Sequence, residues 1–376
     1  MKYIKIINRK KKIYKVLLKY LENQEESTMK SSFHKLVKII ELQKIKSHPP
    51  ELREFLRIIS IISKNHHRFV GFIEKIEKIL FLLSNTIKDS LDNTCIFNIF
   101  KSNRRILLSL FEMEIIKQDK SIFQEELFTV YFYPEIQKVV EKEKFNTINE
   151  QYLKFDPKTF EEKRKIGEND SYICELIRND SVEEFIQFVN RSNINIHKMK
   201  IEPSIFETNS FLMKKTPKLN EYAAFYGSIQ IIQYLNYNNV ELTPSIWIYA
   251  IHSQNAEFFH FLEELKIKQP NNSYEKCLKE SIKCHHNDFA NYIINNLMNH
   301  NNIMRNTDQK VFENIYYYGC RYHNYLYFPR HIHQKYTFFY LCKFNYYRLV
   351  KFCLKSKKIK VNKKIVLIKL LIKIFR

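Results

Sequence analysis

Four residues with metal-binding side chains lie within 14 positions of one another near the C-terminal end of the chain: Cys320, His323, His331 and His333. Thiolate sulfur and imidazole nitrogen are the ligands that Zn²⁺ prefers in proteins. The spacing matches no standard zinc finger, and tyrosine and phenylalanine occupy many of the intervening positions. This composition favours an aromatic insertion packed on neighbouring helices, and we expect neither a metal nor any other cofactor.

A second group of such side chains, Cys284-His285-His286, falls between two predicted helices. A histidine in a turn can cap a helix or face water through either ring nitrogen. We expect solvated or capping histidines here rather than metal ligands.

The chain offers no recognisable catalytic constellation. Its four glycines are scattered, so no glycine-rich loop is available to cradle a phosphate or a dinucleotide. Paired carboxylates could serve acid–base catalysis, but Glu25-Glu26, Glu161-Glu162 and Glu183-Glu184 stand beside lysines or at predicted helix starts. Acids at those places face solvent or stabilise the helix dipole. We therefore predict that the protein is not an enzyme and has no catalytic residues.

The composition favours helices over strands. Only 4 glycines and 9 prolines occur in 376 residues, which is too few for the many tight turns of a β-sandwich. Hydrophobic residues make up 45% of the chain and aromatic residues 15%, so enough apolar surface is present to form a core. These features predict an all-α protein.

The formal net charge of +22 is concentrated at the two ends of the chain. Residues 1–20 contain eight lysines or arginines and no acid, and residues 351–376 contain ten and no acid. The rest of the chain mixes acids and bases, as solvated helix faces do. We expect no nucleic-acid binding except through these two tails.

The cysteine count and the apolar segments predict an intracellular protein, cytoplasmic or nuclear. Seven cysteines without paired spacing do not form a disulfide framework. The longest apolar stretch near the end, 365–375, is interrupted by Lys369 and Lys373 and is too short for a transmembrane helix.

Amphipathic helices are predicted throughout residues 31–165, because apolar residues recur there at intervals of three and four. The strongest patterns cover 33–40, 52–62 and 69–83, and further ones cover 96–100, 104–116, 122–131 and 135–144. Short polar connections between them predict antiparallel helical hairpins.

Internal repetition begins after a polar stretch at 163–169. The segment from Thr216-Pro217 to Leu235 superposes on the segment from Thr243-Pro244 to Leu262 with a constant offset of 27. Thr216 and Thr243 are predicted N-caps, each followed by a proline at the first helical position. Further copies are found at 172–189, 281–293 and 341–353. Each copy predicts a helix, a polar turn and a second helix.

These residues carry a resemblance. Thr216-Pro217, Ala223-Ala224, Gly227 and Ile231-Ile232 resemble the threonine-proline, paired alanines, turn glycine and second helix of an ankyrin repeat. Two extra residues between the proline and the alanines depart from that pattern. Longer strings are "IGENDSYICELIRNDSVEEFI" from Ile166, "CLKESIKCHHNDFANYI" from Cys277 and "ISKNHHRF" from Ile62. Together they resemble an uncharacterised ankyrin-like repeat family, a domain-of-unknown-function group expanded in trichomonad protists.

The resemblance implies ankyrin-type packing and, by analogy, protein partners. The expected fold is an all-α helical solenoid with N-terminal helical hairpins followed by degenerate ankyrin-like repeats. We expect four segments: a basic N-terminal segment at 1–30, helical hairpins at 31–165, ankyrin-like repeats at 166–362 and a basic amphipathic tail at 363–376.

The expected function is that of a monomeric scaffold that binds a protein partner on the concave face of the repeats. Trp247 is the candidate partner-binding residue, because exposed tryptophan on such a face is typical of interface hot spots. The alternative is that Trp247 packs between repeats. An alternative function is recruitment to anionic surfaces, RNA or membrane headgroups, by the basic tails.

Overall fold

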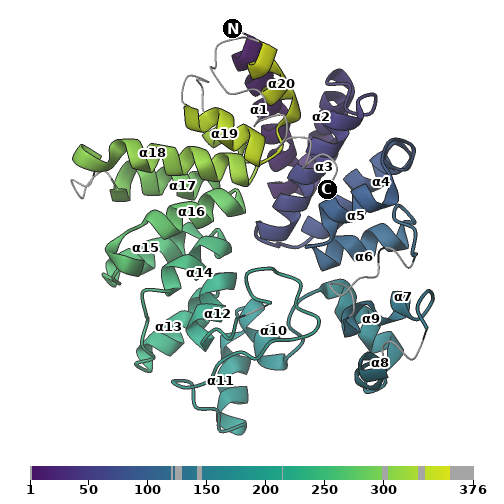
Figure 1. Cartoon of the computed structure of the whole chain (residues 1–376). Coiled ribbons are helices and arrows are strands. Elements are labelled where there is room, and N and C mark those ends of the chain that lie inside the picture. Colours follow the sequence, from purple (N-terminus) through teal and green to yellow (C-terminus); the bar gives the residue numbers. More distant parts are fainter. Residues whose placement is uncertain are drawn as a thin grey trace. The chain divides into compact units, whose positions relative to one another are not determined.

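The computed structural model describes residues 2–119, 122, 129–141, 146–213, 215–298, 304–328 and 335–355. Within these ranges every regular element is a helix, and the only β-type contact is an isolated bridge between Lys200 and Lys218. The all-α prediction is confirmed for this part of the chain (Figure 1). None of the described helices is long and apolar enough to cross a membrane. The expected tail at 363–376 lies outside the described residues.

The N-terminal half contains nine α-helices and one short 3₁₀ helix within the described residues. They are α1 (Lys2–Glu22), α2 (Glu26–Leu42), α3 (Pro49–Asn65), α4 (Phe72–Ser90), α5 (Asn93–Phe100), α6 (Arg104–Glu112), η1 (Val130–Phe132), α7 (Tyr133–Ile136), α8 (Asn146–Tyr152) and α9 (Pro157–Ile166).

Three predicted helices of this half differ from the structure. The helix predicted at 104–116 ends at Glu112, because Glu114 adopts a positive φ and the Ile115 N–H bonds back to the Leu110 carbonyl. The helices predicted at 122–131 and 135–144 fall partly outside the described residues, and the described part holds only η1 and the single turn α7.

The C-terminal half consists mainly of short helices arranged in pairs. They are α10 (Tyr172–Arg178), α11 (Val182–Arg191), α12 (Leu219–Tyr226), α13 (Ile229–Tyr237), α14 (Ile246–Ser253), α15 (Ala256–Glu264), η3 (Pro270–Asn272), α16 (Glu275–Cys284), α17 (Asn287–Tyr292), η4 (Ile293–Met298), α18 (Met304–Arg321), η5 (Tyr325–Tyr327), α19 (Lys335–Lys343) and α20 (Tyr347–Lys355).

Two of these helices begin later than the predicted caps. Thr216 and Thr243 do not cap their helices: α12 begins at Leu219 and α14 at Ile246. The Pro217 carbonyl instead accepts a hydrogen bond from the Ile201 N–H at 2.8 Å, which keeps this residue in extended backbone ahead of the helix.

Five helix pairs share one turn geometry. A single residue with positive φ separates the two helices: Asp180, Gly227, Gln254, His285 and Asn345. In four of the five, the next N–H bonds to the carbonyl five residues earlier: Ser181 to Leu176, Ser228 to Ala223, His286 to Ser281 and Tyr346 to Leu341. This pattern satisfies the free carbonyls at a helix end. Only one turn uses glycine, which explains how a chain with four glycines forms so many tight turns.

The chain packs as two compact units. Unit 1 contains residues 1–61, 68–75 and 278–376, and unit 2 contains 62–67 and 76–277. In unit 1, α1 contacts α2, η5 and α20, so the first helix of the chain packs on its last described one. In unit 2, α10 contacts α12, α12 contacts α14, and α11 contacts α13 (Figure 1). The expected N-terminal segment 1–30 is thus part of a folded unit that also includes C-terminal residues.

Candidate functional site

The hairpin turns of unit 2 contact one another directly. The Asp180 carboxylate, in the turn between α10 and α11, accepts hydrogen bonds from the N–H groups of Gln230 and Ile231, both at 3.0 Å. Both residues lie in the first turn of α13, where free N–H groups favour an anion. A second hydrogen bond joins the same two hairpins: the Ser228 hydroxyl donates to the Ile177 carbonyl at the end of α10. The first hairpin is therefore fixed to the second at their turns.

The turn of the second hairpin packs closely against the turn of the third. Gly227 lies so close to the next turn that a Cβ placed on it would be 3.0 Å from the Ser253 Cβ and 3.3 Å from the Asn255 Cβ. Its φ of 75° is also in the left-handed region that glycine adopts most readily. Successive hairpins of unit 2 are thus stacked turn upon turn.

The chain itself covers part of the face formed by the first helices of these hairpins. The Phe211 ring, from the loop between α11 and α12, lies 5.8 Å from the Phe225 ring on α12, and 5.1 Å and 4.2 Å from the rings of Tyr249 and His252 on α14. The Lys215 Nζ is 3.2 Å from the centre of the Phe211 ring. A partner could not reach these first-helix residues without displacing Phe211.

Trp247 is part of the core of unit 2. Its side chain is 1% exposed, and its indole N–H donates to the Ile267 carbonyl at 3.1 Å. Phe259 and Tyr274 pack on it edge-on at 4.9 Å and 5.6 Å. The structure therefore agrees with the alternative interpretation, in which Trp247 packs between helices. A buried ring offers no contact area to a partner, so we do not retain it as a binding residue.

The structure describes two of the four residues considered for zinc. Cys320 and His323 are buried in unit 1, whereas His331 and His333 lie outside the described residues. Burial raises the pKa of the Cys320 thiol and lowers the pKa of His323 to about 4. A cysteine binds zinc as its thiolate, and burial disfavours that form of Cys320.

The histidines at the turn between α16 and α17 are buried rather than solvated. His285 and His286 are at most 1% exposed. The Tyr14 hydroxyl of α1 lies 2.7 Å from His285 Nδ1, and His286 precedes the first residue of α17. The expectation of solvated histidines is wrong here, because the first helix of the chain packs over this turn.

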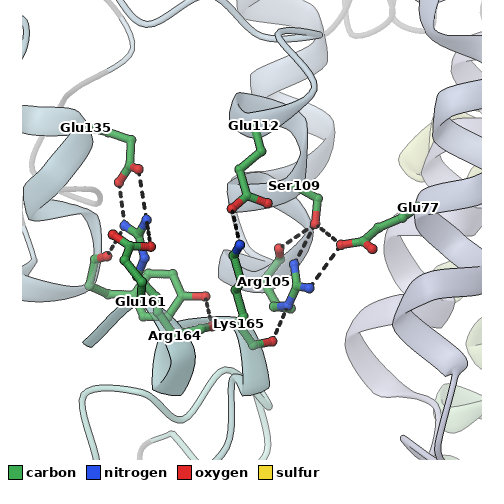
Figure 2. Close-up of polar contacts among 9 residues, drawn as sticks. Glu77, Arg105, Ser109, Glu112, Glu135, Glu161, Arg164 and Lys165 are labelled. Atoms are coloured by element: carbon green, nitrogen blue, oxygen red, sulfur yellow. Dashed lines mark hydrogen bonds and ion pairs between the residues drawn. The ribbon is translucent and has the colours of Figure 1, made fainter. Parts of the chain in front are cut away.

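Unit 2 contains a buried ion pair at Arg164 (Figure 2). The two terminal nitrogens of Arg164 on α9 meet the two carboxylate oxygens of Glu135 on α7 at 2.7 Å and 3.1 Å, and Glu161 adds a third contact at 2.8 Å. The Tyr131 hydroxyl donates to the Arg164 carbonyl, and Arg164 donates to the Tyr131 carbonyl. Burial alone would lower the pKa of the guanidinium, but Glu135 and Glu161 raise it above its ordinary value.

A second network beside it centres on Arg105 of α6 (Figure 2). Arg105 donates to the Lys165 carbonyl and to the Ser109 hydroxyl, both at 2.6 Å, and lies 3.0 Å from Glu77 of α4. The Lys165 Nζ lies 3.6 Å from Glu112 of α6. These contacts bind α4, α6 and α9 together.

The two networks explain the polar stretch at 163–169. Arg164 and Lys165 belong to it, and both join α9 to earlier helices. Gly167 ends α9 with a φ of 72°, and its carbonyl accepts from the Thr208 hydroxyl at 2.7 Å. Both oxygens of the Glu135 carboxylate accept from Arg164, and this bidentate geometry fixes the position of the two side chains relative to each other. We interpret this site as a structural connection within unit 2.

Unit 1 has its own charged centre, in which α3 supplies the acids. The Lys10 Nζ lies 2.5 Å from Glu54 and 3.3 Å from Glu51. Arg348 of α20 meets the other oxygen of Glu51 at 2.7 Å, and the Tyr325 hydroxyl donates to Glu54. Burial alone would raise the pKa of Glu54, but Lys10 and the Tyr325 hydroxyl hold it below its ordinary value. One pair of glutamates therefore joins the basic N-terminal helix to the basic C-terminal one.

Four other bases of α1 take no part in this centre. Lys5, Lys12, Lys15 and Lys19 are exposed, whereas Tyr14 on the opposite face is buried. The helix thus has an apolar inner face and a cationic outer face.

None of the protein-family models, curated proteins or solved structures compared with this chain matches it.

Proposed function

We propose that this protein is a non-enzymatic scaffold that binds a protein partner through a solenoid of degenerate ankyrin-like repeats in unit 2. The observation that supports the proposal is the contact between consecutive hairpin turns, from Asp180 to α13 and from Gly227 to the α14–α15 turn. Hairpins that each contact their neighbours build the extended surfaces with which repeat proteins bind partners. The resemblance to ankyrin-like proteins of trichomonads belongs to this proposal, and the function follows from analogy of fold.

We expect a protein partner to bind the second helices of the hairpins rather than the first. Phe211 covers first-helix residues, and Trp247 is buried. The second helices expose a row of side chains instead, with Gln230, Gln233 and Tyr237 on α13. Tyr237 is 87% exposed, and tyrosine is among the residues most enriched at interface hot spots.

Cross-linking of the full-length chain in extract, followed by peptide mapping, tests this proposal. We expect reproducible protein cross-links to α13 and α15 that are lost in Tyr237→Ser. Phe81→Ser is the matched control, because Phe81 is also highly exposed and lies in unit 2 but outside the hairpins. Recovery of no protein, with nucleic acid co-purifying in a salt-sensitive manner, would contradict the scaffold.

A second candidate function is recruitment to an anionic surface by the basic ends. The observation that favours it is that α1 and α20 contact each other within unit 1, so that the basic helix α1 and the described part of the C-terminal basic segment belong to one unit. Replacing Lys5, Lys12, Lys15 and Lys19 with glutamine should weaken binding to polyanions, most strongly at low salt. Substitution is preferable to deletion, because removing residues 1–20 would also remove buried core residues such as Tyr14.

A further inference from the structure

Aromatic rings surround a lysine where α18 packs on α19 in unit 1. The Lys343 Nζ lies 5.3 Å from the ring centre of Tyr317, 5.9 Å from that of Phe339 and 5.8 Å from that of Phe344. The Tyr317 ring also packs edge-on against Tyr340 at 5.3 Å. We call these five residues the aromatic–cation cluster.

Part of this cluster and the residues that follow it reach the surface. Phe339 is 54% exposed, and Tyr317, Tyr340 and Phe344 are half-buried. Tyr347, at the start of α20, is 43% exposed and has the Lys351 Nζ 5.6 Å from its ring centre. Two exposed rings with a lysine beside each are thus found on adjacent helices.

The stretch of chain that carries these rings is rich in bases. Residues 314–355 contain no aspartate or glutamate, and Arg321, Lys343, Lys351 and Lys355 among them are exposed. Arg348, which pairs with Glu51 of α3, is more enclosed. An anionic ligand would therefore meet several cations without an acid from the same stretch of chain.

We propose that the aromatic–cation cluster and the Tyr347–Lys351 pair bind single-stranded nucleic acid. Bases stack on the exposed faces of Phe339 and Tyr347, and phosphates lie against Lys343 and Lys351. Proteins that bind single strands combine cationic surfaces with aromatic platforms in this way. The proposal rests on the second candidate function above and names its ligand.

Two features favour a single strand over a membrane or a duplex. A helix that lies on a membrane presents a continuous apolar face to the lipid, whereas the apolar residues Leu349, Val350 and Cys353 of α20 are buried. A duplex keeps its bases stacked on one another, so that exposed rings would find no base face to stack on. Exposed rings flanked by lysines suit unstacked bases.

The test is the affinity of the full-length chain for fluorescein-labelled oligouridylate, measured by anisotropy over a series of salt concentrations. We expect Phe339→Leu and Tyr347→Leu each to weaken binding by roughly 5- to 150-fold, the range measured for loss of one base–aromatic stack. Tyr347→Phe keeps the ring and should bind like the unaltered chain. Tyr172→Leu removes a tyrosine of similar exposure (51%) from unit 2 and should change nothing.

Each other outcome contradicts the inference in a distinguishable way. Salt-dependent binding that is indifferent to both leucine substitutions would leave a purely electrostatic attraction, so the second candidate function would stand without the stacking site. Tighter binding to phosphatidylserine vesicles than to oligouridylate would identify a membrane ligand instead. Failure to bind either probe would remove both the inference and the function on which it rests.

Discussion

Replacing Lys10 with methionine tests whether α1 is a structural helix or a basic tail. Lys10 is buried, and its ammonium lies 2.5 Å from Glu54 and 3.3 Å from Glu51. Methionine keeps most of the side-chain length but removes the charge. Two half-buried glutamates then lose a cation that they share.

The expected cost follows from the contacts that remain. Removing one partner of a buried ion pair typically costs about 3–5 kcal/mol, because the other charge is left without compensation. Glu51 retains Arg348 and Glu54 retains the Tyr325 hydroxyl, so we expect a loss near the lower end, about 3 kcal/mol. Lys12→Met is the matched control: Lys12 is exposed on the same helix, and its loss should cost less than about 0.5 kcal/mol.

The effect of Lys10→Met should depend on pH. In the unaltered chain the folded-state pKa of Glu54 is below its ordinary value. Ionised Glu54 therefore stabilises the fold at pH values above its unfolded-state pKa, and this stabilisation is lost as the pH falls through its folded-state pKa. Without Lys10, burial raises that pKa, and protonation at acid pH relieves the penalty. The two chains should therefore differ most near neutral pH and least in acid.

Urea unfolding followed by circular dichroism, at neutral and acid pH, measures both effects. A loss at neutral pH below about 1 kcal/mol would place Lys10 among ordinary surface ion pairs. The same conclusion would follow if Lys12→Met cost as much as Lys10→Met. Either result would refute the interpretation of α1 as a core helix.

Three further substitutions have outcomes that the packing determines. Gly227→Ala should be more destabilising than Gly71→Ala in thermal melts: both have positive φ, but only Gly227 has the next turn within 3.4 Å of the added methyl group. Trp247→Ala should cost about 3–5 kcal/mol in urea unfolding, as for other buried tryptophans, and a near-neutral result would show that the ring is not part of the core. Burial lowers the folded-state pKa of His323 to about 4, so stability should fall as the pH decreases from the ordinary histidine range towards that value. His323→Asn should flatten this part of a stability–pH curve, and an unchanged slope would contradict the assignment.

The helices of the hairpins were predictable because their apolar residues repeat at helical spacing. The repeat copy predicted at 172–189 starts at the first residue of α10, and the patterns at 33–40 and 52–62 fall within α2 and α3. Their starts were less predictable. Thr216-Pro217 has the composition of a cap, but a backbone contact from a distant residue, Ile201, holds the proline outside the helix.

The role of α1 was obscured by its charge. Eight bases among the first 20 residues indicate a solvated tail when they are counted together. Tyr3, Ile7, Tyr14 and Leu17 nevertheless recur on one helical face, and all four are buried. The spacing of these residues, and not the net charge, indicates a buried helix. Only the structure shows that the acids paired with Lys10 come from α3.

The candidate binding residues were harder still to predict. A lone tryptophan suits an interface and a core equally well, and the choice depends on whether Ile267 and Tyr274 return to enclose it. The aromatic–cation cluster draws Tyr317 and Lys343 from different helices, and no spacing along the chain joins them.

The central claim is that the basic helices α1 and α20 belong to one folded unit, and hydrogen exchange of the α1 backbone tests most directly whether α1 is part of it. Amides of residues 13–21 should be protected to the same degree as those of residues 55–61 in α3, with which α1 shares unit 1. Exchange of residues 13–21 at the rate of an unstructured peptide, while residues 55–61 stay protected, would contradict the claim.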